Sequence, residues 1–426
     1  MAHRAASLPS SCDIAIVGAG AAGLAAAIFA RRADPSLTVV LLDGARKPGA
    51  KILVSGGTRC NVTNTAVSER DFWGGKPTIV RRILRAFPVK ETVAFFAGIG
   101  IRLHPEADGK LFPDSNRARD VLAALLEETA RVGADLYADH RVLDVVHGDT
   151  GFLVRTSHGD LHARAVVLAT GGRSLPKTGS DGAGLAMAER LGHTIVPTTP
   201  ALAPLVLSGE AGSFHKPLSG VAHNVELTIK ISGARVTRLT GAMLWTHFGV
   251  SGPVALNASR HWMRAQVEHR DVSIAVNFWP GRTFDDADTE LTTMGRRRPK
   301  LATATALSAS LPASVAAALL RHLDIDGDLP LSQLTRDRRR NLAHALVGWP
   351  LPVAGTRGYN YAEATAGGVA LEEIDPSTMA SRVCPGLYLV GEILDVDGRI
   401  GGFNFQWAWS TARAAGRGLT QNLTRP

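Results

Sequence analysis

Apolar and polar positions along the first third of the chain follow the pattern of a mixed α/β sheet. Residues Asp13–Val17 form a short apolar run, the alanine-rich GAGAAGLAAAIFARR has the composition of a helix, and TVVLLD carries a second apolar run to Asp43. This order predicts a strand, a helix and a strand that together make a βαβ unit. A helical pattern then covers residues 120–133, and three strand patterns follow at residues 141–146, 152–156 and 165–169. Such alternation favours an α/β domain.

The middle of the chain has a different pattern. Residues 197–280 alternate β-branched and polar positions, as in VELTIKISG and VSIAVNFWP, which predicts a β-rich part. The polar stretch TFDDADTELTTMGRRRPK, residues 283–300, is interpreted as a connection, and helical patterns follow at residues 302–323 and 331–347. These helices are too short for a domain of ordinary size, so we expect an insertion packed on the β-rich part. The α/β pattern returns near residue 356 and ends in the strand pattern GLYLV and a helix.

The composition is that of a globular protein, because 45% of the 426 residues are hydrophobic, enough for a sizeable core. The apolar run Ile14–Ala30 is broken by three glycines and lacks the pattern of a secretory signal. We therefore expect a cytoplasmic protein without a membrane segment. Cys12, Cys60 and Cys384 show neither a CxxC pair nor the spacing of a zinc site, so no metal site and no disulfide framework are expected.

The chain carries an excess of positive charge. Lysine and arginine number 47 and aspartate and glutamate 38, which gives a formal net charge of +9. Such a surface attracts polyanions, for example RNA, nucleotides or anionic lipid heads. The basic residues form three clusters: Arg81, Arg82 and Arg85; Arg296, Arg297, Arg298 and Lys300; and Arg336, Arg338, Arg339 and Arg340. They favour either a nucleic-acid footprint or solvated helix faces and loop tips, and the sequence leaves both open.

A glycine fingerprint lies between the first predicted strand and the first predicted helix. Gly18, Gly20 and Gly23 form GxGxxG, with Ala21 and Ala22 between the last two. The three glycines allow a tight turn, a close approach of pyrophosphate and close packing of helix on strand. Phosphates then sit on the unpaired N–H groups at the helix N-terminus, where the helix dipole also favours negative charge.

An acidic residue supports this interpretation. Asp43, followed by Gly44, ends the second predicted strand, where a carboxylate can accept hydrogen bonds from both hydroxyls of an adenosine ribose. A carboxylate at this position disfavours a 2′-phosphate, so the pattern predicts an NAD-like dinucleotide or FAD. The alternative is a glycine-rich turn with no ligand.

Four longer blocks resemble a known family: GAKILVSGGTRCNVTN, THFGVSGPVALNAS, TRGYNYAEATAGGVALEEIDPSTMASR and GLYLVGEILDVDGRIGGFNFQWAWSTARAAG. They are similar, in order and over nearly the whole chain, to the signature blocks of the BaiN/RdsA-like (YhiN-type, aminoacetone oxidase-like) FAD-dependent oxidoreductases. Thr58 and Ala364 depart from the family pattern, which has glycine and valine there.

The resemblance implies an α/β fold with FAD as the cofactor. In that family a Rossmann-like FAD-binding domain of the glutathione reductase superfamily type is interrupted by a β-barrel-like domain and a small helical insertion. We therefore expect the first and second parts of the FAD-binding domain at residues 1–196 and 355–426. The β-barrel-like domain is expected at residues 197–284 and the helical insertion at residues 285–354.

The resemblance also assigns cofactor residues near the C-terminus. It places Gly391 and Glu392 at the ribityl and pyrophosphate portion of FAD, where related flavoproteins carry Gly-Asp. The last block leads into a helix that begins near Phe405, and a helix N-terminus aimed at the flavin N1 and O2 stabilises negative charge on reduced flavin. The residues expected there are Gly401, Gly402, Phe403 and Asn404.

Thr170 and Gly171, in the segment ATGG, are expected on the adenine side of FAD. The alternative interpretation of the C-terminal glycines is a plain turn. Trp407 and Trp409 are expected in the core rather than at the cofactor.

The stretch KILVSGGTRCNVTN follows the acidic end of the second strand, where this superfamily folds its chain over the ribityl and isoalloxazine portion of FAD. The glycines let the backbone approach the cofactor, the basic residues supply charge for phosphates or an anionic flavin, and the asparagines cap turns and bond a ring edge. We expect a flavin-covering loop. Its cofactor-facing residues are Lys51, Ser55, Gly56, Gly57, Arg59, Asn61 and Asn64.

Two residues are candidates for catalysis. A thiol at Cys60, beside Arg59, can have a lowered pKa and donate a proton to a substrate carbon, whereas a lone cysteine is also typical of a small buried hydrophobe. His247 in WTHFGVSGP is the other candidate acid or base, with a structural histidine as the alternative. Ser251 and Gly252 beside it are expected to form a turn over the active face of the flavin.

The chain contains one GxGxxG, so NAD(P)H is expected only as a transient electron donor. The favoured function is the reduction of an electron-poor C=C bond in a small molecule or a nucleobase. The family resemblance links such proteins to steroid enone reduction, amine oxidation and dihydrouridine formation in ribosomal RNA, and the basic clusters favour ribosomal RNA, whose uracil must be extruded for this chemistry. The alternatives are an amine oxidase that uses oxygen and a flavin-loaded RNA-binding protein without turnover.

Overall fold

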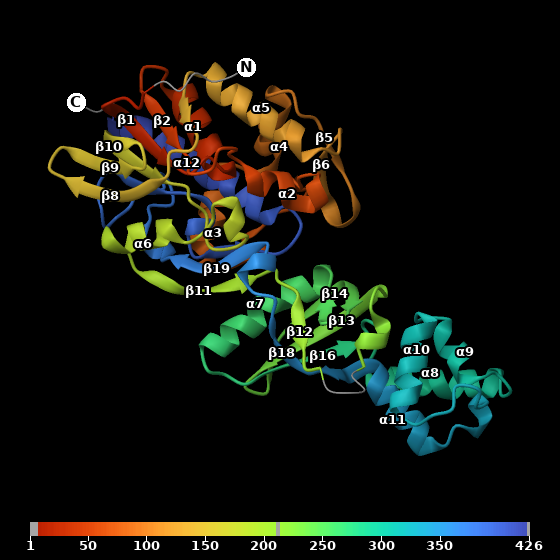
Figure 1. Cartoon of the computed structure of the whole chain (residues 1–426). Helices are drawn as coiled ribbons and strands as arrows, with labels where there is room; N and C mark the ends of the chain where they lie inside the picture. Colours follow the sequence, from red (N-terminus) through yellow and green to blue (C-terminus); the bar gives the residue numbers. More distant parts are fainter. Residues whose placement is uncertain (1–6, 210–213, 424–426) are drawn as a thin grey trace. The chain divides into compact units, whose positions relative to one another are not determined.

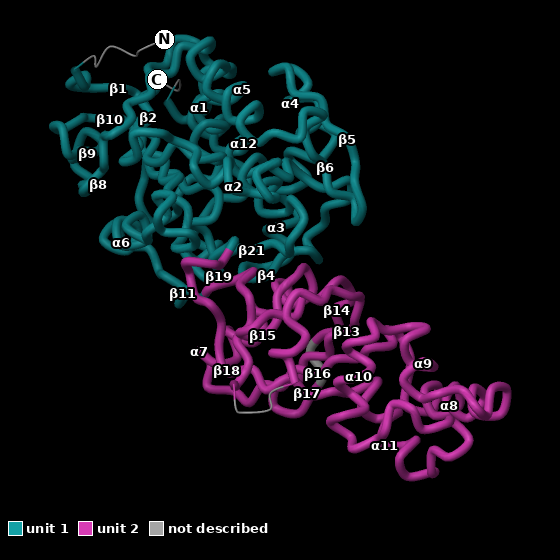
Figure 2. Tube along the Cα trace, turned by 45° about the vertical axis from the view of Figure 1, so that its right-hand side comes forward, with its two compact units in different colours: residues 1–199, 363–426 teal, residues 200–362 magenta. Residues whose placement is uncertain are grey.

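In a computed structural model the chain forms two compact units (Figures 1 and 2). Unit 1 contains residues 1–199 and 363–426, and unit 2 contains residues 200–362. The structure describes residues 7–209 and 214–423, without the side chains of residues 235 and 236. The fold that begins at the N-terminus is thus completed by the last segment of the chain.

Unit 1 is built on a seven-stranded sheet in the order β7-β2-β1-β10-β9-β8, in which β20 also pairs with β10. Strands β7, β2, β1, β10 and β20 are parallel neighbours, and β9 and β8 are antiparallel additions. The strands are β1 Ser11–Val17, β2 Val39–Leu42, β7 Asp135–Tyr137, β8 Val142–Gly148, β9 Gly151–Thr156, β10 Gly159–Leu168 and β20 Leu387–Leu389. Small sheets are formed by β3 Thr63–Asn64, β5 Leu103–Pro105 and β6 Lys110–Pro113; by β4 Phe72–Gly74 and β21 Val396–Gly398; and by β11 Ile195–Ala201 and β19 Ala364–Val369.

The helices of unit 1 pack on this sheet and on one another. They are α1 Ala21–Ala33, α2 Ala50–Thr58, α3 Pro77–Ala86, α4 Val89–Gly98, α5 Ala118–Arg131, α6 Ala183–Arg190 and α12 Phe403–Leu423. Helices α1 and α12 lie against each other, and a Cβ at Gly416 of α12 would come within 2.7 Å of Phe29 Cβ. Glycine and the alanines of α1 therefore permit a helix contact that larger side chains would prevent. Residues 14–17 of β1 and all of β2 are continuous apolar runs, because a parallel sheet is covered on both faces.

Unit 2 contains a seven-stranded sheet in the order β17-β16-β13-β14-β15-β12-β18, with antiparallel pairs throughout. Its strands are β12 Leu205–Leu207, β13 Ala222–Ile231, β14 Ala234–Thr246, β15 Gly249–Ser251, β16 Val272–Asn277, β17 Trp349–Leu351 and β18 Val353–Thr356. Its helices are α7 Pro253–Val267, α8 Phe284–Arg297, α9 Thr303–Ser308, α10 Ala313–His322 and α11 Arg336–Gly348. One apolar core joins the sheet to these helices.

The predicted α/β class is confirmed, the middle part is rich in strands as predicted, and one local expectation is wrong. The stretch at 283–300 is not a connection, since it forms α8, which begins with a capping box between Thr283 and Asp286 and buries Ala287 and Leu291. The part predicted to be β-rich also contains α7, which begins after Gly252. Tertiary burial of a narrow apolar stripe outweighs the polar composition of α8.

Candidate functional site

The glycine fingerprint forms a tight turn with open space on one side. Gly18 has φ of +100°, and a Cβ there would lie 2.7 Å from the carbonyl oxygen of Ala169. A Cβ at Gly23 would lie 1.9 Å from the carbonyl oxygen of Gly18. A Cβ at Gly20, in contrast, would meet no protein atom within 4 Å. Gly18 and Gly23 are thus required for close packing, whereas no protein atom covers the position of a side chain at Gly20.

Helix α1 begins next to this open space. The first hydrogen bond of the helix runs from Leu24 N–H to the Gly20 carbonyl at 3.0 Å. The N–H groups of Ala21, Ala22 and Gly23 therefore precede the helical ladder, and such groups bind phosphate well.

Asp43 is fixed beside the fingerprint by backbone donors. Its Oδ2 accepts from Ala19 N–H at 2.7 Å and its Oδ1 accepts from Ala45 N–H at 2.8 Å. A carboxylate has about four acceptor positions, so two of them are left for a ligand. Gly44, the next residue, is closely packed, because a Cβ there would lie 3.2 Å from Arg141 Cβ.

Two further predicted segments lie at the same end of the sheet. Thr170 Cα would be 3.2 Å from a Cβ on Gly18, and Thr170 and Gly171 follow the end of β10. Gly391, just after β20, has φ of +76°, and a Cβ there would lie 2.8 Å from the Cβ of Ala22. The parallel strands β1, β10 and β20 thus bring three segments that are far apart in the sequence to one place.

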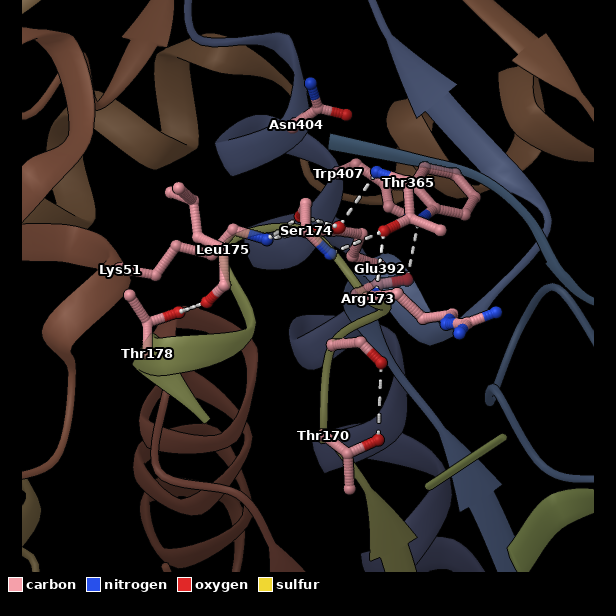
Figure 3. Close-up of polar contacts among 12 residues, drawn as sticks. Lys51, Thr170, Arg173, Ser174, Leu175, Thr178, Thr365, Glu392, Asn404 and Trp407 are labelled. Carbon is pink, nitrogen blue, oxygen red and sulfur yellow. Dashed lines mark hydrogen bonds and ion pairs between the residues drawn. The ribbon is translucent and has the colours of Figure 1, made fainter. Parts of the chain in front are cut away.

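A polar network connects α2 with the segments after β10 and β20 (Figure 3). Glu392 Oε2 forms an ion pair with Lys51 Nζ at 2.5 Å, and Glu392 Oε1 accepts from Ser174 Oγ at 2.6 Å and from Thr365 N–H at 3.0 Å. The Thr365 hydroxyl in turn accepts from the N–H groups of Arg173 and Ser174. Trp407 Nε1 donates to the Gly391 carbonyl at 3.1 Å.

This network gives Lys51 and Glu392 a shared role. Their side chains are 26% and 15% exposed, so the ion pair is largely sheltered from water. The charge of Lys51, expected to be available to a phosphate or an anionic flavin, is balanced within the protein. The sequence analysis does not identify Ser174 or Thr365, whose only signal is their position shortly after the ATGG segment and within the ATAGGV segment.

The stretch 51–64 is part helix and part loop. Residues from Ala50 continue as α2 until the non-helical Ser55, and the chain then takes left-handed conformations at Gly56, Gly57, Thr58 and Cys60, with φ between 54° and 69°. Thr58 has φ of 69°, a conformation in which a β-branched residue is strained and glycine is not. Ser55 Oγ donates to the Ile52 carbonyl at 2.7 Å.

Arg59 is directed away from this network. Its guanidinium donates to Glu106 Oε1 at 2.6 Å and lies 4.0 Å from the centre of the Phe112 ring. The neighbouring guanidinium lowers the pKa of Glu106. The structure thus gives Arg59 protein partners.

The NVTN end of the stretch holds the start of α12. Asn64 Nδ2 donates to the Gly401 carbonyl at 3.0 Å, and Thr63 Oγ1 donates to Gln406 Oε1 at 2.7 Å. With its amide oriented to satisfy its neighbours, Asn61 accepts from Gly402 N–H at 3.1 Å. These side chains therefore fix the glycine turn that positions the helix N-terminus.

The remaining residues of that turn also have protein contacts. Asn404 is paired with the backbone of Gly398, accepting at 2.8 Å and donating at 3.0 Å. Phe403 is buried. Trp407 and Trp409 are buried too, which confirms their expected place in the core.

The two catalytic candidates lie in different units. Cys60 is fully buried in unit 1, and burial raises the pKa of its thiol to about 12, against a weaker lowering by a hydrogen bond with Ser55. His247 lies in unit 2 between β14 and β15 and is exposed. Ser251 ends β15 and Gly252, with φ of +85°, precedes α7, as a turn requires.

Among residues 7–209 and 214–423, no helix is long and apolar enough to cross a membrane. Within the same ranges, no group of three or more His, Cys, Asp or Glu side chains is arranged to hold a metal ion.

Solved structures share this fold. The quinol fumarate reductase FrdA of E. coli superposes with a TM-score of 0.50 and 18% identity, covering 97% of this chain and 70% of that one. The 3-ketosteroid delta1-dehydrogenase of Sterolibacterium denitrificans gives a TM-score of 0.50 and 14% identity, covering 97% of this chain and 100% of that one. At such identities the likeness concerns the fold alone.

Closer similarity is found in sequence. The chain is 33% identical over 408 residues to the 3-dehydro-bile acid delta(4,6)-reductase of Clostridium scindens, with 96% of this chain and 99% of that protein covered. It is 33% identical over 410 residues to the ribosomal RNA dihydrouridine synthase of Escherichia coli, with 96% and 98% covered. The family model described as HI0933-like protein Rossmann domain matches residues 12–418. The family predicted from the four sequence blocks is thereby confirmed: the chain belongs to the HI0933-like family.

Proposed function

We propose that this protein is an FAD-dependent oxidoreductase that reduces an electron-poor C=C bond, and that its substrate is uridine in ribosomal RNA. The oxidoreductase class is confirmed by the family match and by relatives named as a reductase and as dihydrouridine synthases. The single observation that carries the substrate proposal is the similarity over 96% of the chain to the dihydrouridine synthase. The net charge of +9 supports it, because RNA is a polyanion.

The described residues of unit 1 fit FAD. The open side of Gly20 and the N–H groups of Ala21 and Ala22 suit a pyrophosphate, and the free acceptor positions of Asp43 suit a ribose. We place the Thr170–Gly171 and Gly391–Glu392 segments along the adenosine and ribityl portions, since they border the fingerprint. When bound, FAD supplies hydride-transfer chemistry.

Two parts of unit 1 prepare the flavin position in this proposal. The ion pair of Lys51 with Glu392 holds α2 against the segment after β20, so the backbone of Ser55–Gly57 keeps one position. Asn61 and Asn64 hold Gly401 and Gly402, and the N-terminus of α12 that follows favours negative charge. These residues orient and polarise without donating a proton themselves.

His247 stays the candidate proton donor that the sequence suggests. It is exposed, and an imidazole can serve as a general acid or base. Cys60 is a weaker choice, because its thiol is fully buried and its pKa is raised to about 12. We therefore favour the structural interpretation of Cys60, and we propose NADPH or NADH as a transient donor of electrons in the cytoplasm.

The test is anaerobic stopped-flow absorbance of the purified yellow protein. The protein is mixed with NADPH or NADH and then with protein-free ribosomal RNA that lacks the modification. Bleaching of the flavin by the nicotinamide, recovery on addition of RNA and dihydrouridine in the product are expected. If only a steroid enone restores the flavin colour, the reductase chemistry stands and the RNA substrate falls. If only oxygen or a small amine changes the flavin, the reductase proposal is overturned.

A further inference from the structure

We propose that the helical part of unit 2 carries an RNA-docking surface, a basic tip formed by Arg296, Arg297, Arg298, Lys300 and Arg336. The inference rests on the proposed function, because it takes RNA as the substrate. It adds the place where the phosphates of the RNA are held, which the cofactor site in unit 1 does not define.

The fold brings together two clusters that are separate in the sequence. Asp288 of α8 pairs with Arg339 of α11 at 2.8 Å, and the rings of Phe284 and His344 stack with their centres 4.0 Å apart. The beginning of α8 therefore lies against the middle of α11, as in an antiparallel pair. Figure 1 shows both helices in the helical group at one end of unit 2.

Backbone hydrogen bonds join the opposite ends of the same pair. Leu331 N–H donates to the Leu301 carbonyl at 2.9 Å, and Ser332 N–H donates to the Pro299 carbonyl at 3.0 Å. The segment before α11 is thus fixed to the segment after α8. The C-terminal arginines of α8 and Arg336, the first residue of α11, consequently lie at one end of the helical part.

The side chains of this tip are available to a partner. Arg296, Arg297, Arg298 and Lys300 are all exposed, and none of them forms an ion pair within the described residues. Residues 295–300 contain four basic side chains and no acidic one, and Arg336 adds a fifth basic side chain next to Asp337. Four exposed basic side chains without an ion pair attract an anionic partner more strongly than a helix face of mixed charge does.

Three neighbouring basic residues, in contrast, lie close to other side chains of unit 2. Arg339 holds Asp288, and Arg340 lies 4.8 Å from the centre of the Phe284 ring. Arg338 lines a cavity of about 560 Å³ together with Asp324 and Asp326. These three residues stabilise the helices or face carboxylates, so they are excluded from the tip.

The helices that carry the basic tip are capped and well packed. Thr283 and Asp286 cap α8, the Thr335 hydroxyl accepts from Arg338 N–H, and Leu291 and Leu342 are buried in the core of unit 2. Arginines on a fixed support can bind phosphate oxygens through two N–H groups at once. The surface fits the backbone of a folded RNA, which it would bind without reading bases.

The experiment compares two sets of variants of the FAD-loaded full chain. The test variant is R296Q/R297Q/R298Q/K300Q, and the matched control is R81Q/R82Q/R85Q on α3, where Arg81 is already paired with Glu69 at 2.7 Å. Binding to protein-free ribosomal RNA is measured by fluorescence anisotropy over a series of salt concentrations. The test variant is expected to bind at least about tenfold more weakly, with a salt slope smaller by about 3, as four lost phosphate contacts predict.

The outcomes separate this inference from the proposed function. Unchanged affinity and slope in the test variant, or a larger loss in the control, would overturn the RNA-docking surface. A tip-dependent binding of phosphatidylglycerol vesicles without tip-dependent RNA binding would overturn it too, in favour of a lipid surface. If RNA binding depends on the tip but the wild-type protein forms no dihydrouridine, the docking surface stands and the proposed substrate chemistry fails.

Discussion

In unit 1 the basic side chains of Lys51, Arg59 and Arg81 each form an ion pair with a glutamate. In unit 2 the basic side chains at the end of α8 are exposed, and no ion pair involves them in the described part of the chain. In the sequence both groups are basic residues among glycine or polar residues, so the sequence alone does not distinguish them. The difference teaches that a basic side chain is available to an anionic ligand only where the fold leaves its charge uncompensated.

The largest effect on stability is expected at the ion pair in unit 1. Lys51→Met leaves the sheltered carboxylate of Glu392 without its counter-charge, and we expect a loss of about 2 kcal/mol in the free energy of unfolding. Urea denaturation measures it. The control Arg46→Met removes an ion pair whose arginine side chain is 87% exposed, and it should cost less than about 0.5 kcal/mol. Equal losses in both variants would remove the distinction between sheltered and exposed charge.

The next effect depends on pH and concerns Cys60. Its pKa is raised from 9.0 to about 12 in the folded protein because the thiol is desolvated. A raised pKa means that the unfolded chain loses this proton first, so the stabilisation is complete below about pH 9 and declines as pH rises toward 12. Between pH 8 and pH 10, the wild type should lose about 1 kcal/mol more than Cys60→Ala. If urea denaturation gives the same loss for the wild type and Cys60→Ala, the thiol is not desolvated in the folded protein.

A stabilising change is expected at Thr58. Its φ of 69° is unfavourable for a β-branched side chain, and Thr58→Gly should raise the free energy of unfolding by about 1 kcal/mol. Thermal denaturation detects it. Thr293→Gly, in the interior of α8, provides the matched control and should be destabilising by about 1 kcal/mol. Destabilisation by both variants would show that the left-handed turn imposes no strain.

The smallest effect on stability is expected at the basic tip. Because its side chains are exposed and lack ion pairs in the described structure, R296Q/R297Q/R298Q/K300Q should change the free energy of unfolding by less than about 0.5 kcal/mol. A loss above about 2 kcal/mol would mean that these arginines hold the helices, as Arg339 does, and would weaken the comparison between the units.

Sequence reasoning succeeded where a feature is local. The strand, the GxGxxG turn and Asp43 lie within a short stretch, and their geometry follows from glycine conformations and from the end of a strand. The ion pair of Lys51 with Glu392 joins residues 341 positions apart, so no local pattern could reveal it. The same holds for the bonds from Asn61 and Asn64 to the turn before α12.

The missed helix shows a different limit. Helix α8 has a polar composition, yet its signals were present as a capping box at Thr283 and Asp286 and as buried residues four apart, Ala287 and Leu291. A narrow apolar stripe stabilises a helix only when another surface covers it, and for α8 that surface is α11. Sequence composition alone does not reveal that partner.

The central claim is that a dinucleotide cofactor occupies the open side of Gly20, and flavin absorbance of a purified variant tests it most directly. In Gly20→Val the added side chain meets no protein atom where its Cβ begins, so it should displace only the ligand. The control Gly348→Val places the same side chain at another position where a Cβ has no neighbour within 4 Å. We expect a folded but colourless Gly20→Val protein and a yellow control. A folded Gly20→Val protein that retains its full flavin absorbance would contradict the account.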